Sequence, residues 1–268
     1  MTPRPKLRPP SPERAQSTEA EAEATSGLAR SILAAPTSRE AARRVRDAER
    51  THPGARDALV EELAGTVLRL LRVDARSALA AAERQAVAAR GRPLLEARAL
   101  WSRAHALTNL SRHAEAADHY ARAASAYGRL GQPLLAARTT LGHVDALMYL
   151  GRYEEALSIG KAARSVLLRH GELRSIVGLE TNLANILHRT DRPAASLRAY
   201  DRALRTARRL NDAQRSRWIQ FNRANALVAL GRFDEAEDLY RKVRSGAERT
   251  SESWVVALVD YSLGYLCV

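Results

Sequence analysis

The sequence repeats itself every 40 residues, and no other feature restricts the fold as strongly. The segment Gly-Arg-Pro-Leu-Leu-Glu-Ala-Arg at 91–98 returns as Gly-Gln-Pro-Leu-Leu-Ala-Ala-Arg at 131–138. A second segment begins Ser-Arg-His at position 111, Gly-Arg-Tyr at 151, Asp-Arg-Pro at 191 and Gly-Arg-Phe at 231. A constant period of this length is typical of repeat proteins, in which each unit buries its apolar face against its neighbours.

Small residues recur at two places in each period and predict a pair of closely packed helices. The first set is Ala104, Val144, Ala184 and Ala224, and the second set is Ala116, Ala156, Ser196 and Ala236. Small side chains let helix backbones approach, and the apolar residues around them follow helical spacing. We therefore expect two helices of about 17 residues in each unit. Val144 is larger than its equivalents, which predicts an altered packing angle in that unit.

An aromatic residue stands four positions after each small residue of the second set, with one exception. The residues at this place are Tyr120, Gly160, Tyr200 and Tyr240. Together these positions resemble the tetratricopeptide repeat family, whose units are antiparallel helix pairs with small residues at two crossing points. The resemblance implies an all-α fold, a right-handed superhelical solenoid of antiparallel helix pairs. The usual unit of the family has about 34 residues, so the helices here should be longer than usual.

Composition divides the chain into three parts. Residues 1–26 are rich in Pro, Ser, Glu and Ala and poor in large apolar side chains, which predicts a disordered tail. Residues 27–53 are expected to form a short helical lead-in, with Thr37 or Ser38 as a helix cap after Pro36. Residues 54–268 should form the array, with about five units and the first helix of another. Because Trp254 and the apolar residues after it lack a partner helix, we expect the array to continue or to dock on another molecule.

The charge is strongly positive but has two interpretations. The formal net charge is +13, and only three of the 43 basic residues are lysine. A basic surface attracts nucleic acid or acidic proteins, whereas a GC-rich coding sequence also favours arginine. A single cysteine, an N-terminus unlike a signal peptide and the absence of a long apolar run predict a cytoplasmic protein that does not enter a membrane.

The sequence contains no pattern that indicates an active site. Glycine-rich phosphate loops, a Gly-x-Ser-x-Gly elbow and a His-Glu-x-x-His helix are all absent. The seven histidines are scattered, and no two of them have the i, i+4 spacing that places two metal ligands on one helix face. We therefore expect neither an enzyme nor a bound metal or cofactor.

The resemblance implies that the exposed face of the first helices lines a concave groove. The predicted groove residues are Trp101, His105, Asn109, Asp145, Tyr149, Asn182, Asn185, Arg189, Phe221, Asn222 and Asn225. An asparagine amide can donate to and accept from the backbone of an extended peptide, so the asparagines favour a peptide ligand. The alternative is that they cap helices or bridge neighbouring repeats. The basic residues of the family's carboxylate clamp are missing, so a C-terminal carboxylate ligand is not expected.

A second candidate surface is a stripe of arginines on one predicted helix. Arg198, Arg202, Arg205 and Arg209 have the spacing of a single helix face. A solvated face is one interpretation, and an acidic partner or nucleic acid is the other. The leading functional prediction is a scaffold that binds a protein or peptide in its groove, as the sensing or docking part of a larger protein. The alternatives are the regulatory array of a CHAT-type protease or of a transcriptional regulator, which rest on repeat style alone, and nucleic-acid binding through the arginines.

Overall fold

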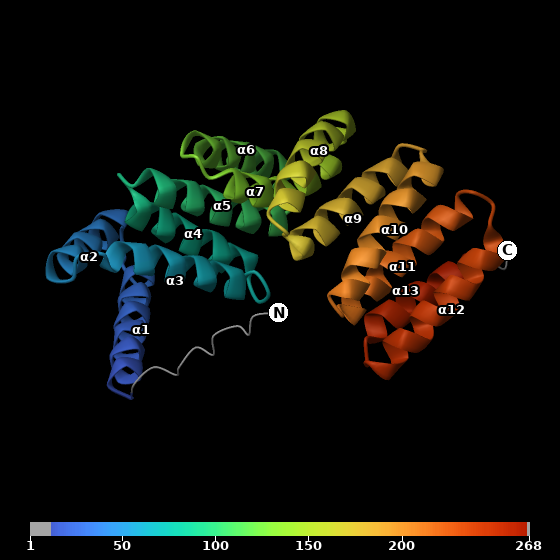
Figure 1. Ribbon diagram of the computed structural model, residues 1–268. Coiled ribbons are helices and arrows are strands. Elements are labelled where there is room, and N and C mark those ends of the chain that lie inside the picture. The colour runs from blue at the N-terminus through green and yellow to red at the C-terminus, as the bar shows by residue number, and fades with distance from the viewer. Residues whose placement is uncertain (1–11, 267–268) are drawn as a thin grey trace, which may run out of the picture. The chain divides into compact units, whose positions relative to one another are not determined.

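The computed structural model describes residues 12–266, with side chains from residue 21 onward, and within this range it is built from helices without any strand (Figure 1). The all-α class predicted from the repeats is confirmed. The helices are α1 (Pro12–Leu33), α2 (Ser38–Thr51), α3 (Ala55–Leu70), α4 (Ala75–Ala89), α5 (Pro93–Asn109), α6 (His113–Arg129), α7 (Pro133–Tyr149), α8 (Tyr153–Arg169), α9 (Leu173–Arg189), α10 (Pro193–Arg209), α11 (Ala213–Val228), α12 (Phe233–Arg249) and α13 (Ser253–Leu266).

The helix boundaries follow the 40-residue period. Helices α5, α7, α9, α11 and α13 begin at 93, 133, 173, 213 and 253, and α5 to α10 each have 17 residues, as the repeat predicts. A residue with positive φ ends each turn between helices. Gly151 has this conformation at φ 72°, and its equivalents Ser111 and Asp191 adopt it at 58° and 53°. The shared turn explains why Gly, Ser and Asp alternate at this place in the sequence.

The chain forms two compact units, Met1–Arg112 and His113–Val268, and the division falls inside the range predicted as one array. In the first unit, α1 packs on α3 and α2 packs on α4. Their core includes Ile32, Val45, Leu59 and Leu63, all nearly or fully inaccessible. No helix among the described residues combines the length and the apolar character that a bilayer crossing requires.

The start of the first unit differs from the sequence prediction. Helix α1 begins at Pro12, so residues 12–26 are helical rather than a disordered tail, and residues 1–11 lie outside the described part. The segment is rich in Ala and Glu, which are strong helix formers. The far end of the same helix buries Ala29 and Ile32 in the core, and this packed end stabilises the turns that precede it.

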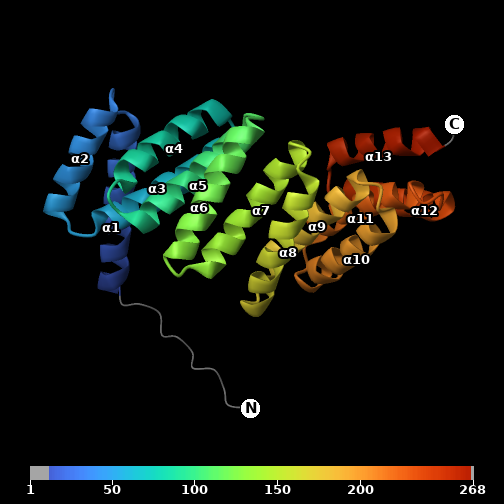
Figure 2. The same cartoon turned by 90° about the horizontal axis from the view of Figure 1, so that it is seen from above.

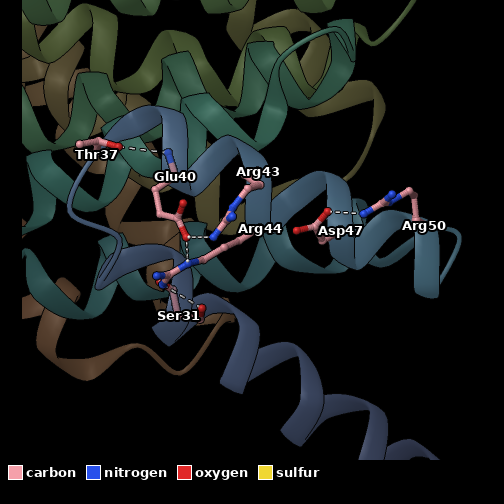
Figure 3. Close-up of polar contacts among 7 residues, drawn as sticks. All are labelled: Ser31, Thr37, Glu40, Arg43, Arg44, Asp47 and Arg50. Atoms are coloured by element: carbon pink, nitrogen blue, oxygen red, sulfur yellow. Dashed lines mark hydrogen bonds and ion pairs between the residues drawn. The ribbon is translucent and has the colours of Figure 1, made fainter.

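Polar contacts hold α2 in place, as Figure 3 shows. The hydroxyl of Thr37 accepts a hydrogen bond from the Glu40 backbone N–H at 3.1 Å, which confirms the predicted cap. Glu40 also forms ion pairs with Arg43 and Arg44. The guanidinium of Arg44 donates to the Ser31 backbone oxygen at 2.6 Å and so connects α2 to the end of α1.

In the second unit, each helix packs on the next, and α9 to α12 lie side by side in both views (Figure 1, Figure 2). Helix α7 also contacts α9, and α9 contacts α11, so the first helices of successive repeats are neighbours. The small residues Ala184, Ala224 and Ala236 are fully buried at the helix crossings. Tyr200 and Tyr240 fill the core beside them.

The exception at Gly160 has a structural explanation. A Cβ atom built on Gly160 would lie 2.6 Å from Cδ2 of Leu183 and 3.4 Å from Cγ2 of Val144. The two aliphatic side chains therefore occupy the space beside Gly160. The larger Val144 and the missing aromatic ring are two sides of one exchange of volume. The predicted change of packing angle stays a prediction.

Candidate functional site

Three of the predicted groove residues lie in the first unit, on α5. The Arg98 guanidinium lies 5.2 Å from the ring centre of Trp101, and the Trp101 and His105 rings are 5.9 Å apart. Burial lowers the pKa of His105 to about 4, and the positive charge of Arg98 acts in the same direction. Asn109 donates its amide to the backbone oxygen of His105 at 3.0 Å, a contact within its own helix.

The other eight lie in the second unit, where tyrosines engage two of the asparagines. The Tyr200 hydroxyl donates to Oδ1 of Asn185 at 2.6 Å, and the Tyr240 hydroxyl donates to Oδ1 of Asn225 in the same way. Each bond joins the first helix of a repeat to its own second helix. The interpretation of these asparagines as structural bridges is thus supported, although the bridge lies within a repeat rather than between repeats. Burial raises the pKa of both tyrosines, so both hydroxyls keep their protons at neutral pH.

The two bridging amides keep part of their hydrogen-bonding capacity. With Oδ1 of Asn185 and of Asn225 turned toward a tyrosine, each Nδ2 group still has protons to donate. One turn earlier stand Asn182 and Asn222, which are half-buried. Neither of these amides makes a hydrogen bond to another described residue. We call these four residues the asparagine face.

Asp145 occupies the register of Asn185 and Asn225 on α7, but it has no tyrosine opposite. The place of that tyrosine is taken by Gly160. Burial raises the pKa of the half-buried Asp145 carboxyl, while the nearby His113 lowers it. One turn further, the Tyr149 ring is stacked on the His113 ring at 4.4 Å and 7°. In the second unit as described, no cation forms an ion pair with Asp145.

Arg189 and Phe221 complete the predicted set and differ in their environments. Arg189 is exposed at the end of α9, and no described acid pairs with it. Phe221 is buried, with 5% of its surface accessible, and its ring centre lies 5.7 Å from that of Tyr240 and 5.6 Å from that of Trp218. Phe221 is therefore a core residue under the surface rather than a side chain free to meet a ligand.

Sequence reasoning missed the hollow beside Phe221. The rings of Trp218 and Trp254 lie 5.5 Å apart, and both are partly exposed. They line a hollow of about 350 Å³ between α11 and α13, together with the ion pair of Arg217 and Glu252. The position of Trp218, three residues before Phe221 on a helix, was the available signal.

A smaller hollow opens next to the asparagine face. It measures about 170 Å³, and its lining includes Asn225 and Val228 from α11 and Tyr261 and Tyr265 from α13. The two tyrosine side chains are about three-quarters exposed. The surface around Asn225 is thus concave and carries both aromatic and amide groups.

The arginine stripe on α10 is interrupted. Arg198, Arg205 and Arg209 are exposed, but Arg202 forms a two-pronged ion pair with Glu180, at 2.8 and 3.0 Å to Oε2. Glu180 is 1% exposed and also pairs with Arg164. Arg202 therefore belongs to a buried network that joins α9 to α8 and α10. Three residues of the predicted four remain available to a partner.

The described residues contain no cluster of three or more His, Cys, Asp or Glu side chains arranged to hold a metal ion. No curated protein matches the sequence.

Solved structures with the same fold are similar over most of the chain. BtubC (BKLC) from P. vanneervenii is 20% identical, with a TM-score of 0.68 over 84% of this chain and 92% of that one. The apo form of RapI is 12% identical, with a TM-score of 0.65 over 91% and 70% of the two chains. A Rap protein complexed with competence and sporulation factor is 14% identical, with a TM-score of 0.59 over 92% and 74%. At these identities the likeness concerns the fold.

The family model for the tetratricopeptide repeat matches residues 175–249, which include α10, α11 and α12. The matched segment carries three members of the asparagine face. The chain is a helical repeat scaffold of the tetratricopeptide repeat family, with a unit of 40 residues in place of the usual length.

Proposed function

We propose that the second unit binds an extended peptide, or an extended segment of a protein, through the asparagine face. The observation that carries the proposal is the repetition of the amides at 40-residue spacing, with one of each pair oriented by a tyrosine and the other unengaged. Asparagine is unfavourable in the middle of a helix, because its amide competes with the backbone. Four such residues on adjacent first helices point to a use outside the fold.

The division of labour between the amides suits a peptide backbone. Asn185 and Asn225 are held by their tyrosines, so their Nδ2 donors are oriented before a ligand arrives and lose little entropy on binding. Asn182 and Asn222 keep both a donor and an acceptor, which matches the alternating N–H and C=O groups of an extended chain. Contacts to the backbone give affinity without requiring a particular peptide sequence.

Charged groups on the same first helices add selectivity. Asp145 on α7 and Arg189 on α9 are both without an ion-pair partner in the described structure, so each is free to pair with a charge on the ligand. Among proteins of similar fold, a Rap protein has been solved in complex with competence and sporulation factor, which supports a binding role for such an array. In this proposal the chain serves as a docking module.

The test begins with peptides selected from a displayed random library on the full chain. Their affinity is then measured by fluorescence anisotropy for the double variant Asn182→Ala, Asn222→Ala. Each lost hydrogen bond is worth about 1 kcal/mol, so the double variant should bind about tenfold or more weakly. These two positions are preferred to Asn185 and Asn225, whose removal would also leave a buried tyrosine hydroxyl unpaired.

The matched control is Gln220→Ala, which removes an amide from the same helix α11. Gln220 lines a different cleft, with residues of α10 and α12. The control should bind the selected peptides with unchanged affinity. Equal affinity for the double variant, or an equal loss in the control, would show that the peptides bind elsewhere.

A further inference from the structure

A polar cleft of about 430 Å³ opens between α10, α11 and α12, away from the asparagine face. Four basic side chains line it: Arg208 from α10, Arg217 from α11, and Lys242 and Arg249 from α12. The lining contains one carboxylate, that of Asp212. The cleft is therefore strongly positive, and the question is how much of this charge the protein itself neutralises.

Most of the positive charge is not neutralised. Arg208 and Lys242 are exposed and form no ion pair with any described acid. Arg249 donates only to a neutral group, the Ser245 hydroxyl, at 2.7 Å. Arg217 is engaged by Glu252. Three of the four cations thus lack a counter-charge.

The single carboxylate is already committed. Asp212 caps α11 by accepting from the Arg215 backbone N–H at 2.9 Å, and its other oxygen lies 3.6 Å from Nε of Arg215. Because both oxygens face Arg215, Asp212 offsets little of the charge on Lys242, Arg208 and Arg249.

A buried hydroxyl points independently to a ligand. Ser216 is only 8% exposed and lines the cleft, yet its hydroxyl makes no hydrogen bond to any described residue. Other buried hydroxyls of the unit are satisfied by helix backbone oxygens: Thr139 by Leu135 at 2.8 Å and Thr181 by Val177 at 2.8 Å. Leaving a buried donor unpaired is costly, so a group that accepts from Ser216 is expected in the cleft.

We propose that this cleft binds a compact phosphate-bearing molecule. Phosphate oxygens accept strong charge-assisted hydrogen bonds from Lys242, Arg208 and Arg249, and one oxygen accepts from the Ser216 hydroxyl. The first turn of α11, which begins at Ala213 in the lining, adds the favourable end of a helix dipole. The volume exceeds that of a single phosphate group, and the residues that line it include no aromatic ring for stacking a base. A small molecule with two linked phosphates therefore fits the cleft better than a nucleic-acid strand.

The test is isothermal titration calorimetry of the full chain with pyrophosphate and with inorganic phosphate. Pyrophosphate should bind saturably at one site per chain and more tightly than phosphate. Lys242→Gln should weaken binding at least tenfold, because a hydrogen bond to a charged group is worth about 1.5–3 kcal/mol. Ser216→Ala should weaken it several-fold without changing the net charge.

Two exposed residues outside the cleft provide controls of matched charge. Lys161→Gln on α8 and Arg205→Ala on α10 should leave pyrophosphate binding unchanged, whereas equal losses would reveal a general charge effect. The double variant of the asparagine face should also keep the affinity, since the two sites are separate. Far-ultraviolet circular dichroism checks that each variant is folded.

Three results would overturn the proposal. The first is the absence of saturable pyrophosphate binding at low ionic strength. The second is wild-type affinity in both Lys242→Gln and Ser216→Ala. The third is binding of a single-stranded oligonucleotide, tighter than pyrophosphate and increasing with length, that Arg205→Ala reduces as much as Lys242→Gln does. That outcome would assign the charge to a nucleic-acid surface.

Discussion

Gly160→Ala should destabilise the second unit, although glycine to alanine normally stabilises a helix interior. Gly160 lies in the middle of α8, where alanine is favoured over glycine by about 1 kcal/mol. The new Cβ, however, would lie 2.6 Å from Cδ2 of the buried Leu183 and 3.4 Å from Val144. Real Cβ atoms essentially never approach another heavy atom as closely as 2.6 Å, so the neighbours must move.

The overlap should outweigh the gain in helix propensity. Adding a methyl group to a well-packed core costs about 1–3 kcal/mol. Subtracting the gain of about 1 kcal/mol leaves a net destabilisation of about 1 kcal/mol, with the upper limit near 2. Leu183 is a flexible side chain in a helix of the next repeat, so partial relaxation keeps the value below that of a rigid clash.

Two other helical glycines calibrate the result. Gly178 lies in the interior of α9, and its Cβ would meet only Cδ2 of Leu141 at the ordinary distance of 3.6 Å, so Gly178→Ala should stabilise by about 0.5–1 kcal/mol. At Gly142 the Cβ would lie 2.3 Å from the ring of the buried Tyr120. A buried ring yields less than an aliphatic chain, so Gly142→Ala should cost about 3 kcal/mol.

Urea denaturation followed by circular dichroism measures the three free energies of unfolding. The expected order of stability is Gly178→Ala, wild type, Gly160→Ala, Gly142→Ala. The double variant Gly160→Ala, Leu183→Ala should show a favourable coupling energy, because removal of the Leu183 side chain removes the overlap. If Gly160→Ala stabilises the chain as much as Gly178→Ala does, the claim that Leu183 and Val144 fill the space of the missing ring is wrong.

Three further predictions concern buried polar groups. Tyr240→Phe should lower the free energy of unfolding by about 1 kcal/mol, measured in urea, because Asn225 loses its hydrogen-bond donor; an unchanged midpoint would contradict the bridge. Glu180→Gln should cost about 2 kcal/mol, since the buried carboxylate holds two arginines, whereas the exposed Glu237→Gln should cost less than about 0.5 kcal/mol. The pKa of His105 is lowered from 6.5 to about 4, so the unfolded chain binds more protons between these values and stability should fall as the pH drops through this window; His105→Gln should flatten the dependence in thermal denaturation.

The repeat was readable from the sequence because its signals are local. The turn residues and the small residues at the crossings sit at constant intervals, and they placed the helix starts at 93 and 133 and at later multiples of 40. The bridges to Asn185 and Asn225 were also visible in principle. Tyr200 and Tyr240 each stand 15 residues after an asparagine, a spacing that brings two helices of one hairpin together.

Features that depend on contacts between repeats could not be predicted in this way. The neighbour of Gly160 is Leu183, which comes from the following repeat, and the partner of Trp218 is Trp254, 36 residues along the chain. Arg202 looked like one member of an exposed stripe, because its spacing on α10 does not reveal the buried Glu180 opposite. Periodicity predicts which face a residue shares, and the neighbouring helix then decides whether it is free.

The same contrast explains why the repeats of the second unit are not equivalent as binding surfaces. Where a tyrosine follows 15 residues after the groove position, the amide of Asn185 or Asn225 is oriented by the fold and presents a donor. Where Gly160 replaces the tyrosine, Asp145 is left without that partner, and burial raises the pKa of its carboxyl. A ligand lying along α7, α9 and α11 would therefore meet a charged group first and two oriented amides after it. This asymmetry gives a regular array a direction, because a peptide that places its cation at Asp145 cannot be reversed without losing that pair.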